Sequence, residues 1–477
     1  MMLSVLADQS LEGQDSADKY RKKTVVSWGL GADSTAIIFA FCDDPVAHGL
    51  LPDLSDLIVV VALTGDEWPN TMDLCEEYVL PLLAQYNVRL VQVSRRGPLD
   101  EQGIQVLSDS RQTKRLFRHG DWTQSQEMRV AGTVPQFAAR RRTCSIRFKG
   151  WVIDLWTAGE FGLHAYRHVI GYELDEPDRA ERDHSYASPT RMPWHPLIEW
   201  GFDRPRIQRF FVAKFGFEWP KSYCVQCPFP VSRAALGAHL ARCRQFPELT
   251  AAVLRMEHTA LALNPRSTLY AEGSLLSLVT ADANTAALDA FEASLAASRW
   301  SVYEVRRIYF AARTRECRRA HGKTCRVPAR ACRENRVVPS ALCKAEHGAL
   351  CFKIEDECWQ TKAFRSPACR ATHGVQCSLP AEECRDPEAK GLAWRSVHTV
   401  YQGERDQCRE FLERRADEEK RPTATVDGIT RLALQEVGLR FPTAERCLVV
   451  APVGVADKAR EFFENAWERI AYAETSH

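Results

Sequence analysis

The first half of the chain alternates between short apolar runs and longer stretches that carry one apolar face. The apolar runs are rich in β-branched residues, as in LIVVVAL at 57–63, which is typical of strands buried on both sides of a sheet. This alternation predicts an α/β fold, in which helices cover both faces of a parallel sheet. The predicted strands are 24–28, 57–63, 88–93 and one that ends at 168–171, and the predicted helices are 34–42, 72–86 and 234–263.

The pattern changes after residue 264, which predicts a domain boundary near residue 265. The segment 97–134 is polar and rich in Gln and Arg, so it is predicted to be a long loop or a lid. Near the end of the chain, two helix-like segments surround a strand-like run at 447–453. The predicted parts are an N-terminal tail (1–22), a first domain (23–265) and a C-terminal mixed domain (266–477).

Composition narrows the choices further. A formal net charge of +1 does not favour a polybasic protein, and 45% hydrophobic residues is ordinary for a globular chain. No apolar run reaches the roughly 18 residues of a membrane span, and the first residues lack the pattern of a signal peptide. We therefore expect no membrane contact and a cytoplasmic location. Because that compartment is reducing, the seventeen cysteines indicate metal binding or redox chemistry rather than disulfides.

The segment Ser27–Thr35 joins a predicted strand to a predicted helix and contains two glycines. Glycines let the backbone approach a phosphate closely, so that several N–H groups point into one concavity. Ser34 and Thr35 add hydroxyl donors at the positive N-terminus of the helix. Asp33 is expected to bind Mg²⁺ or to orient the loop. A Walker-type loop is excluded, because no G-x-x-x-x-G-K-[ST] is present.

This segment resembles the SGGxDS loop of PP-loop ATP pyrophosphatases, in the variant S-x-G-x-G-x-D-S-T. Further segments resemble elements of the phosphoadenylyl-sulfate reductase-like branch of that superfamily and follow in its order. They are Thr64–Glu67 (TGDE), Arg142–Ser145 with Arg147 and Lys149, Gly171–Glu176 with Arg179, and Cys224–Phe229 (CVQCPF). The resemblance covers about residues 24–260 of the chain.

The resemblance implies a HUP-like PP-loop domain over 23–265, which binds ATP and Mg²⁺, adenylylates a substrate and releases pyrophosphate. Catalysis in such a site depends mainly on positioning and on charge neutralisation. The implied catalytic residues are Asp33, Ser34, Arg142 and Lys149. The implied contacts of the adenine nucleotide are Ser27, Gly29, Gly31, Asp33, Ser34, Thr35, Thr64, Gly65, Asp66, Glu67 and Gly171.

A basic stretch lies between these elements. Residues 111–149 contain ten Lys and Arg and two acidic residues. Such a stretch is suited to holding phosphates or a nucleic-acid backbone. The alternative is a solvated helix face.

Three cysteines stand within the segments that carry the resemblance. Cys224 and Cys227 have C-x-x-C spacing, which can direct two thiolates to one ion, and Cys144 is expected to join them after folding. Their positions look like those of cluster ligands in iron–sulfur members of the superfamily, so a [4Fe-4S] cluster, a zinc ion and redox or structural thiols remain the alternatives. A fourth ligand would be Cys243, or one iron would stay open. Other cysteines in apolar contexts are expected to be core residues: Cys42, Cys75 and Cys447.

A Cys-x3-His-Gly-x2-Cys-x6-Cys unit occurs three times at an offset of 26 residues within 317–384. Each copy supplies three thiols and one imidazole, which is the ligand set of a closed structural zinc site. Disulfide pairing is the alternative. The segment 313–347 contains ten Lys and Arg and three acids, which suits nucleic acid or a docking protein. The predicted ligands are Cys317, His321, Cys325, Cys332, Cys343, His347, Cys351, Cys358, Cys369, His373, Cys377 and Cys384. Similar runs at 300–305 and 394–400 flank the repeats and suggest an insertion.

Together these observations predict an ATP-dependent enzyme that adenylylates a substrate for sulfur insertion. The expected acceptor is a nucleic acid, either tRNA or DNA, with a sulfur-donor protein as partner. One alternative is a reductase or sulfotransferase-like enzyme acting on a sulfated adenine nucleotide, although no E-C-G-[IL]-H element follows Cys408. Another is a non-catalytic protein that senses a nucleotide and binds nucleic acid.

Overall fold

The structure is a computed structural model, and it describes residues 22–135, 137–138, 141–232, 234–271, 273–315, 333–339, 359–365 and 385–471. The chain divides into two compact units, Met1–Ser298 and Arg299–His477, which we describe separately. This division lies after the boundary predicted near residue 265. The reason is that helices α13 (Leu275–Ala281) and α14 (Thr285–Ala296) pack on α12 (Pro247–Leu263) and so belong to the first unit.

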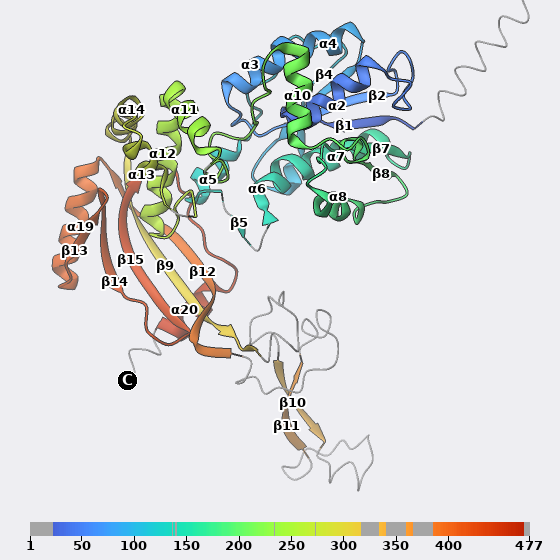
Figure 1. Ribbon diagram of the computed structural model, residues 1–477. Coiled ribbons are helices and arrows are strands. Elements are labelled where there is room, and N and C mark those ends of the chain that lie inside the picture. Colours follow the sequence, from blue (N-terminus) through green and yellow to red (C-terminus); the bar gives the residue numbers. More distant parts are fainter. Residues whose placement is uncertain are drawn as a thin grey trace, which may run out of the picture. The chain divides into compact units, whose positions relative to one another are not determined.

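The first unit is built on a six-stranded, mostly parallel sheet (Figure 1). Its strands, in spatial order, are β4 (Ile104–Ser110), β3 (Arg89–Arg95), β2 (Leu57–Leu63), β1 (Thr24–Ser27), β7 (Tyr166–Val169) and β8 (Arg191–Trp194). Every neighbouring pair is parallel except β3 and β4. The predicted α/β fold with a parallel sheet is therefore confirmed at this level.

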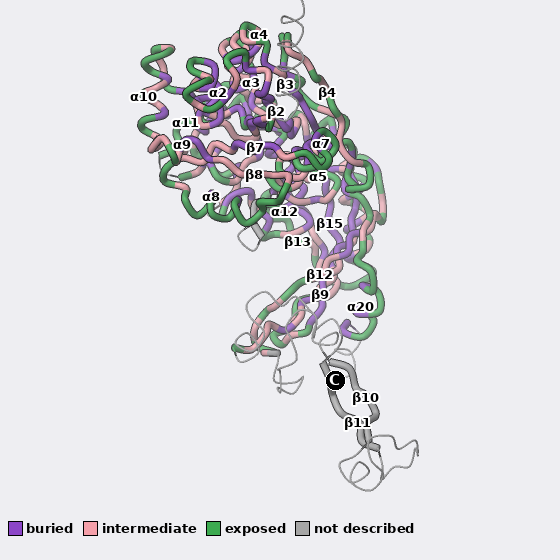
Figure 2. The backbone as a smooth tube through the Cα atoms, turned by 90° about the vertical axis from the view of Figure 1, so that its right-hand side faces the viewer, coloured by how far each residue is buried: buried purple, intermediate pink, exposed green. Residues whose placement is uncertain are grey.

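Helices cover both faces of this sheet, and each strand sends alternate side chains to the two sides. Val26 and Val59 join a core with helices α2 (Ala32–Asp43) and α10 (Arg204–Phe215), whereas Val25 joins a core with α7 (Trp151–Phe161). Figure 2 shows the central strands as the most continuously buried part of the unit. Helices α3 (Pro69–Tyr78) and α4 (Leu80–Gln85) border the first of these cores.

Three local predictions need correction. The segment 97–134 is not one long loop, because it contains β4, which pairs with β3, and the capped helix α5 (Gln124–Ala131). The single helix predicted at 72–86 is two helices, α3 and α4, since a proline opens the second. The helix predicted at 234–263 is likewise divided by Pro247 into α11 (Leu236–Gln245) and α12.

The remaining elements of the first unit are short. They are η1 (Asp100–Gln102), β5 (Phe137–Ala138), β6 (Arg141–Arg142), α6 (Thr143–Ser145), η2 (Ile146–Gly150), α8 (Pro177–His184) and α9 (Pro196–Glu199). The structure describes the backbone of β5 and β6 but not their side chains.

The second unit contains a five-stranded antiparallel sheet. In spatial order its strands are β12 (Arg385–Gly403), β9 (Trp300–Arg313), β15 (Thr443–Pro452), β14 (Ile429–Gln435) and β13 (Thr423–Val426). Helix α20 (Phe463–Ala471) packs Phe463 and Trp467 against Ile308, and α19 (Arg405–Glu419) also borders the sheet. In the described part of the chain, no helix is long and apolar enough to cross a membrane.

The twelve predicted Cys and His ligands of the repeats lie outside the described residues. Between them the structure describes one antiparallel ribbon, β10 (Arg333–Pro339) with β11 (Trp359–Arg365). Strands β10, β11 and β12 each begin directly after the last cysteine of one repeat, so they share its offset. Arg313 and Arg385 are paired in β9 and β12, so the two residues that flank the segment 314–384 lie side by side.

Candidate active site

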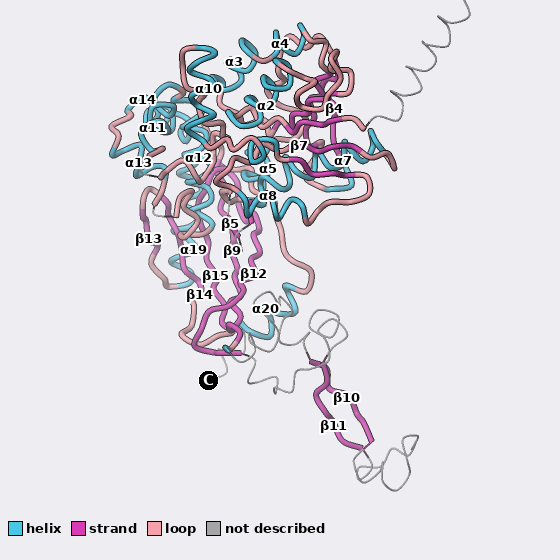
Figure 3. The backbone as a smooth tube through the Cα atoms, turned by 45° about the vertical axis from the view of Figure 1, so that its right-hand side comes forward, coloured by secondary structure: helices cyan, strands magenta, loops and turns pink. Residues whose placement is uncertain are grey.

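The predicted nucleotide segments meet at the carboxyl edge of the parallel sheet. Figure 3 shows strands of the first unit, among them β4 and β7, in magenta with helices around them. From β1 the chain builds outward through β2 to β3, whereas β7 and β8 are added on the other side of β1. The order of the strands therefore reverses between β1 and β7. In open α/β sheets, ligands bind outside the carboxyl ends of the strands at such a point.

The loop after β1 is held in a tight turn by its own side chains. The N–H of Gly29 donates to Ser34 Oγ at 3.1 Å, and Ser222 Oγ donates to the Gly29 carbonyl at 3.0 Å. The indole N–H of Trp28 donates to Thr35 Oγ1 at 3.0 Å. Leu30 adopts a φ of 60°, a region that a non-glycine residue rarely enters. The loop is thus preformed around the N-terminus of α2.

Two glycines allow neighbouring segments to approach this helix terminus. A Cβ on Gly31 would lie 2.6 Å from Ser222 Oγ, and a Cβ on Gly171 would lie 2.8 Å from the backbone nitrogen of Ser34. Gly31 is the N-cap of α2 and has no side chain that could cap the helix. The first N–H groups of α2 are therefore left to backbone or ligand acceptors, as at helix N-termini that bind anions.

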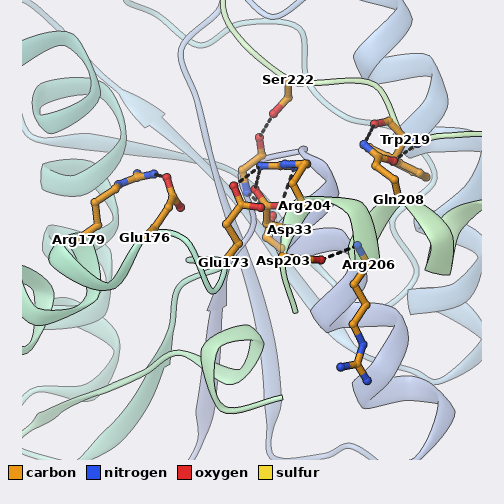
Figure 4. A network of polar contacts seen from close by, with 12 residues as sticks. Asp33, Glu173, Glu176, Arg179, Asp203, Arg204, Arg206, Gln208, Trp219 and Ser222 are labelled. Atoms are coloured by element: carbon orange, nitrogen blue, oxygen red, sulfur yellow. Dashed lines mark hydrogen bonds and ion pairs between the residues drawn. The ribbon is translucent and has the colours of Figure 1, made fainter. Parts of the chain in front are cut away.

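An arginine that the sequence analysis missed faces this terminus. Arg204 pairs with Asp33, at 2.8 Å between Nη1 and Oδ1, and with Glu173, at 3.3 Å between Nη2 and Oε1 (Figure 4). Burial raises the pKa of Asp33, although Arg204 opposes that shift. The signal in the sequence was Asp203-Arg204-Pro205, in which Asp203 caps α10 and the proline opens it.

His168, which the sequence analysis also missed as a site residue, contacts Ser27 at the end of β1. Ser27 Oγ is 2.7 Å from His168 Nε2, and the other ring nitrogen, Nδ1, is 2.7 Å from Arg191 Nε. Arg191 in turn pairs with Asp183 at 2.7 Å. Burial, reinforced by Arg191, lowers the pKa of His168 to about 3, so the ring is neutral near pH 7.

The loop after β2 is organised by Glu67. Its carboxylate accepts hydrogen bonds from the backbone N–H groups of Thr64, Gly65 and Asp66, at 3.0, 3.1 and 3.2 Å, and from the Thr64 hydroxyl at 2.7 Å. Asp66 accepts from the Ser125 N–H at 2.7 Å, and burial raises its pKa. Glu67 and Asp66 are therefore engaged in shaping the loop.

The same loop is joined to the C-x-x-C segment. Glu67 and Cys224 form an isolated antiparallel bridge, and the Val225 N–H donates to the Asp66 carbonyl at 2.8 Å. Thr64 Oγ1 lies 3.5 Å from Cys224 Sγ. The predicted nucleotide and cysteine elements are thus connected through the backbone and one side chain.

Lys149 interacts electrostatically with all three predicted cysteines. Burial alone would lower the pKa of Lys149, but its electrostatic interactions with Cys224, Glu67, Cys227 and Cys144 outweigh burial and raise it. Burial raises the pKa of Cys224, against the influence of Lys149. Lys149 therefore links Glu67 electrostatically to these cysteines, and the predicted convergence of the three cysteines on one ion stays a prediction.

These thiols do not form a ready metal site. Within the described ranges, no three His, Cys, Asp or Glu side chains are arranged to hold a metal ion. Cys243, the predicted fourth ligand, is buried in α11 with its sulfur 3.9 Å from His239 Nε2. The expected core cysteines Cys42, Cys75 and Cys447 are indeed buried.

In the basic stretch at 111–149, two arginines form ion pairs with acidic residues of the first unit. Arg118 pairs with Asp73 at 2.7 Å, and Arg147 pairs with Glu127 at 2.9 Å. The backbone of Arg142 belongs to β6, but its side chain lies outside the described set, so its predicted catalytic role stays a prediction.

In the comparisons with known proteins, no family model, no curated protein and no solved structure matches this chain. The geometry of the site therefore carries the functional argument.

Proposed function

We propose that this protein is an ATP-dependent enzyme of the PP-loop type, which adenylylates a substrate and releases pyrophosphate. The observation that carries the proposal is the close approach of Gly171 to the Ser34 nitrogen, at the point where the strand order reverses. It brings the loops after β1 and β7 together around an uncapped helix N-terminus. That arrangement suits the phosphates of a nucleotide.

The residues at this edge fit such a ligand. The glycine contacts leave backbone N–H groups of the loop and of α2 to hold phosphate oxygens. Arg204 adds a positive charge beside them. Asp33 and Glu173 are the carboxylates that would hold Mg²⁺, which when bound neutralises charge on the phosphates.

In the proposed reaction a substrate oxygen attacks the α-phosphorus of ATP. The bond from that phosphorus to the oxygen bridging to the β-phosphate breaks, and pyrophosphate leaves. The loop residues orient the phosphates, and Arg204 balances the charge that develops on the leaving group. This division of work needs positioned donors and little covalent chemistry from the protein.

The cysteine group supports sulfur transfer as the second half of the reaction. Cys224 contacts Thr64 and forms a backbone bridge with Glu67, so the C-x-x-C segment is attached to the loop after β2, which is part of the proposed nucleotide site. The described thiols do not fit a preformed metal site, and we derive no step through a cluster there. The proposed role of these thiols is to receive sulfur from a sulfur-donor protein and to pass it to the activated substrate, from which AMP leaves.

The test is pyrophosphate release from ATP by the full chain, with Asp33→Ala as the variant. Asp43→Ala is the matched control, because Asp43 lies in the same helix and pairs only with the surface residue Lys214 in the described contacts. The proposal expects release by the wild type and by Asp43→Ala, and its loss in Asp33→Ala. Equal release by both variants would sink it.

The same preparation separates the alternatives. Tighter binding of phosphoadenylyl-sulfate than of ATP would favour the reductase or sulfotransferase-like enzyme. ATP binding without turnover, together with salt-sensitive binding of DNA or RNA, would favour the non-catalytic protein.

The repeats are proposed to bind structural zinc and to contact a tRNA or DNA acceptor, in a cytoplasm that keeps thiols reduced. Zinc, when bound, would staple units that have little apolar core. Elemental analysis should find about three zinc ions per chain, one for each Cys3His set. Absence of zinc from protein purified without chelators would contradict this assignment.

A further inference from the structure

The hydrogen bonds around His168 fix which ring nitrogen carries the proton. Arginine can only donate, so the 2.7 Å contact from Arg191 Nε makes Nδ1 of His168 an acceptor without a proton. The neutral ring must then carry its proton on Nε2. That nitrogen lies 2.7 Å from Ser27 Oγ, so His168 donates to Ser27.

This assignment also determines what the Ser27 hydroxyl can do. A serine hydroxyl has one proton to donate, and it can accept at its lone pairs. His168 occupies an accepting position, which leaves the proton of Ser27 for an acceptor elsewhere. Among the residues that the structure describes, none other hydrogen-bonds to this hydroxyl. Ser27 is only partly buried, and it ends β1 where the strand order reverses.

The support behind His168 is rigid. Arg191 begins β8 and pairs with Asp183 of α8 at 2.7 Å, and both side chains are about nine-tenths buried. Asp183 also faces His195 Nε2 at 3.4 Å. The chain of contacts therefore runs from α8 through β8 and β7 to β1, and each member is held by a strand or helix.

We propose that His168 is a positioning residue, which fixes the Ser27 hydroxyl as a hydrogen-bond donor to a phosphate oxygen of the bound nucleotide. Arg191 sets the tautomer of His168 and thereby the direction of the Ser27 proton. This inference rests on the nucleotide site proposed above. Its ligand chemistry is that of an anion, because a committed donor stabilises a phosphate oxygen and gains nothing from a cation.

The test measures ATP and adenosine affinity of the full chain by calorimetry, for Ser27→Ala, His168→Leu and the double variant. Ser27→Ala is expected to weaken ATP binding about tenfold, as for loss of a hydrogen bond to a charged group. His168→Leu should weaken it about fivefold in the wild-type background and not at all in the S27A background. Adenosine, which has no phosphate, should bind all of them alike.

His168→Gln is the rescue variant. Its amide oxygen can accept from Arg191 while its NH₂ group donates to Ser27, so ATP affinity should return to within about twofold of the wild type. Thermal unfolding checks that each variant is folded. Two results would overturn the inference and indicate a merely structural histidine. One is that His168→Leu weakens ATP binding equally in the wild-type and S27A backgrounds. The other is that the variants lose adenosine affinity as much as ATP affinity. A wild type that binds no ATP would instead overturn the nucleotide site itself.

Discussion

The two central strands of the parallel sheet, β1 and β2, carry no charged residues, whereas charged side chains lie along the strands of the antiparallel sheet. Strand β2 is buried at every position, and the nearest polar side chains, Thr64 and Glu67, lie in the loop that follows it. Strand β9 instead contains Glu304, Arg306 and Arg307 between buried apolar residues, and of these three Arg307 is itself buried. The difference follows from packing, because strands covered on both faces cannot hold charges without partners.

Two charged pairs of the antiparallel sheet form between neighbouring strands. Arg307 pairs with Glu445 on β15 at 3.1 Å, and Arg446 pairs with Glu304 at 2.6 Å. At the carboxyl edge of the parallel sheet the pairing differs, because one arginine, Arg204, forms ion pairs with both Asp33 and Glu173. We infer that substitutions at that edge will change ligand binding, and that substitutions within the antiparallel sheet will change stability alone.

The largest expected effect is at Gly171. An added Cβ would meet the Ser34 nitrogen at 2.8 Å, and a backbone atom cannot move aside cheaply. Gly171→Ala should therefore weaken ATP binding about a hundredfold, a cost of about 2.7 kcal/mol, within the range of overpacking. Calorimetric titration with ATP measures the change.

Gly159→Ala is the matched control, because a Cβ there meets nothing within 4 Å and the residue lies inside α7. Alanine in a helix is about 1 kcal/mol more favourable than glycine, so this variant should be at least as stable and bind ATP normally. Normal binding by Gly171→Ala would break the assignment of the edge.

The next effect is a loss of stability of the first unit in acid. Burial lowers the pKa of His168 to about 3 and that of His239 to about 4, from an ordinary value of 6.5. The folded state then binds fewer protons than the unfolded state, so the stability is present above pH 6.5 and is lost as pH falls towards 4. Between pH 6.5 and 5.5 each histidine should remove about 1 kcal/mol.

Urea unfolding followed by tryptophan fluorescence at the two pH values measures this loss. His168→Gln should remove about half of it, since glutamine does not titrate. A pH-independent midpoint would contradict the neutral, buried state of these rings.

Arg204→Met should weaken ATP binding about tenfold, because the site loses a cation and leaves Asp33 and Glu173 facing one another. Arg206→Met is the control in the same helix, since Arg206 reaches only the carbonyls of Trp200 and Gly201 and the ring of Phe202 in its described contacts. Titration with ATP compares the two. If both variants bind alike, the charge of Arg204 contributes nothing specific to the site.

These predictions rest on features that the sequence revealed unequally. Periodicity located β2 at its observed bounds, because an uninterrupted apolar run has one packing solution. It missed β4, whose apolar and polar residues do not alternate and which takes its structure from pairing with β3. Strand pairing joins residues far apart in the chain, and single-sequence patterns do not contain that information.

The site divides in the same way. Motif spacing identified Asp33, Gly171 and the C-x-x-C segment, because each has a local signature. His168 has no such signature, and the capped helix start at Asp203-Arg204-Pro205 predicts a helix but not the ion pairs of Arg204. Both roles depend on partners far along the chain, 171 residues away for Arg204 and 141 for His168. Only the fold brings these residues together, so the charge balance at the edge could not be predicted from the sequence.

The smallest expected effect is at Arg307, and it tests the other side of the comparison. Arg307 is buried and pairs with Glu445, but Tyr309 also donates to that carboxylate at 2.6 Å. Arg307 also lowers the pKa of its neighbour Arg395, after burial, so its removal relieves some repulsion. Arg307→Met should therefore cost only about 1 kcal/mol of stability. ATP affinity and pyrophosphate release should not change, and a loss of either beyond about threefold would show that charges of the antiparallel sheet serve the nucleotide site.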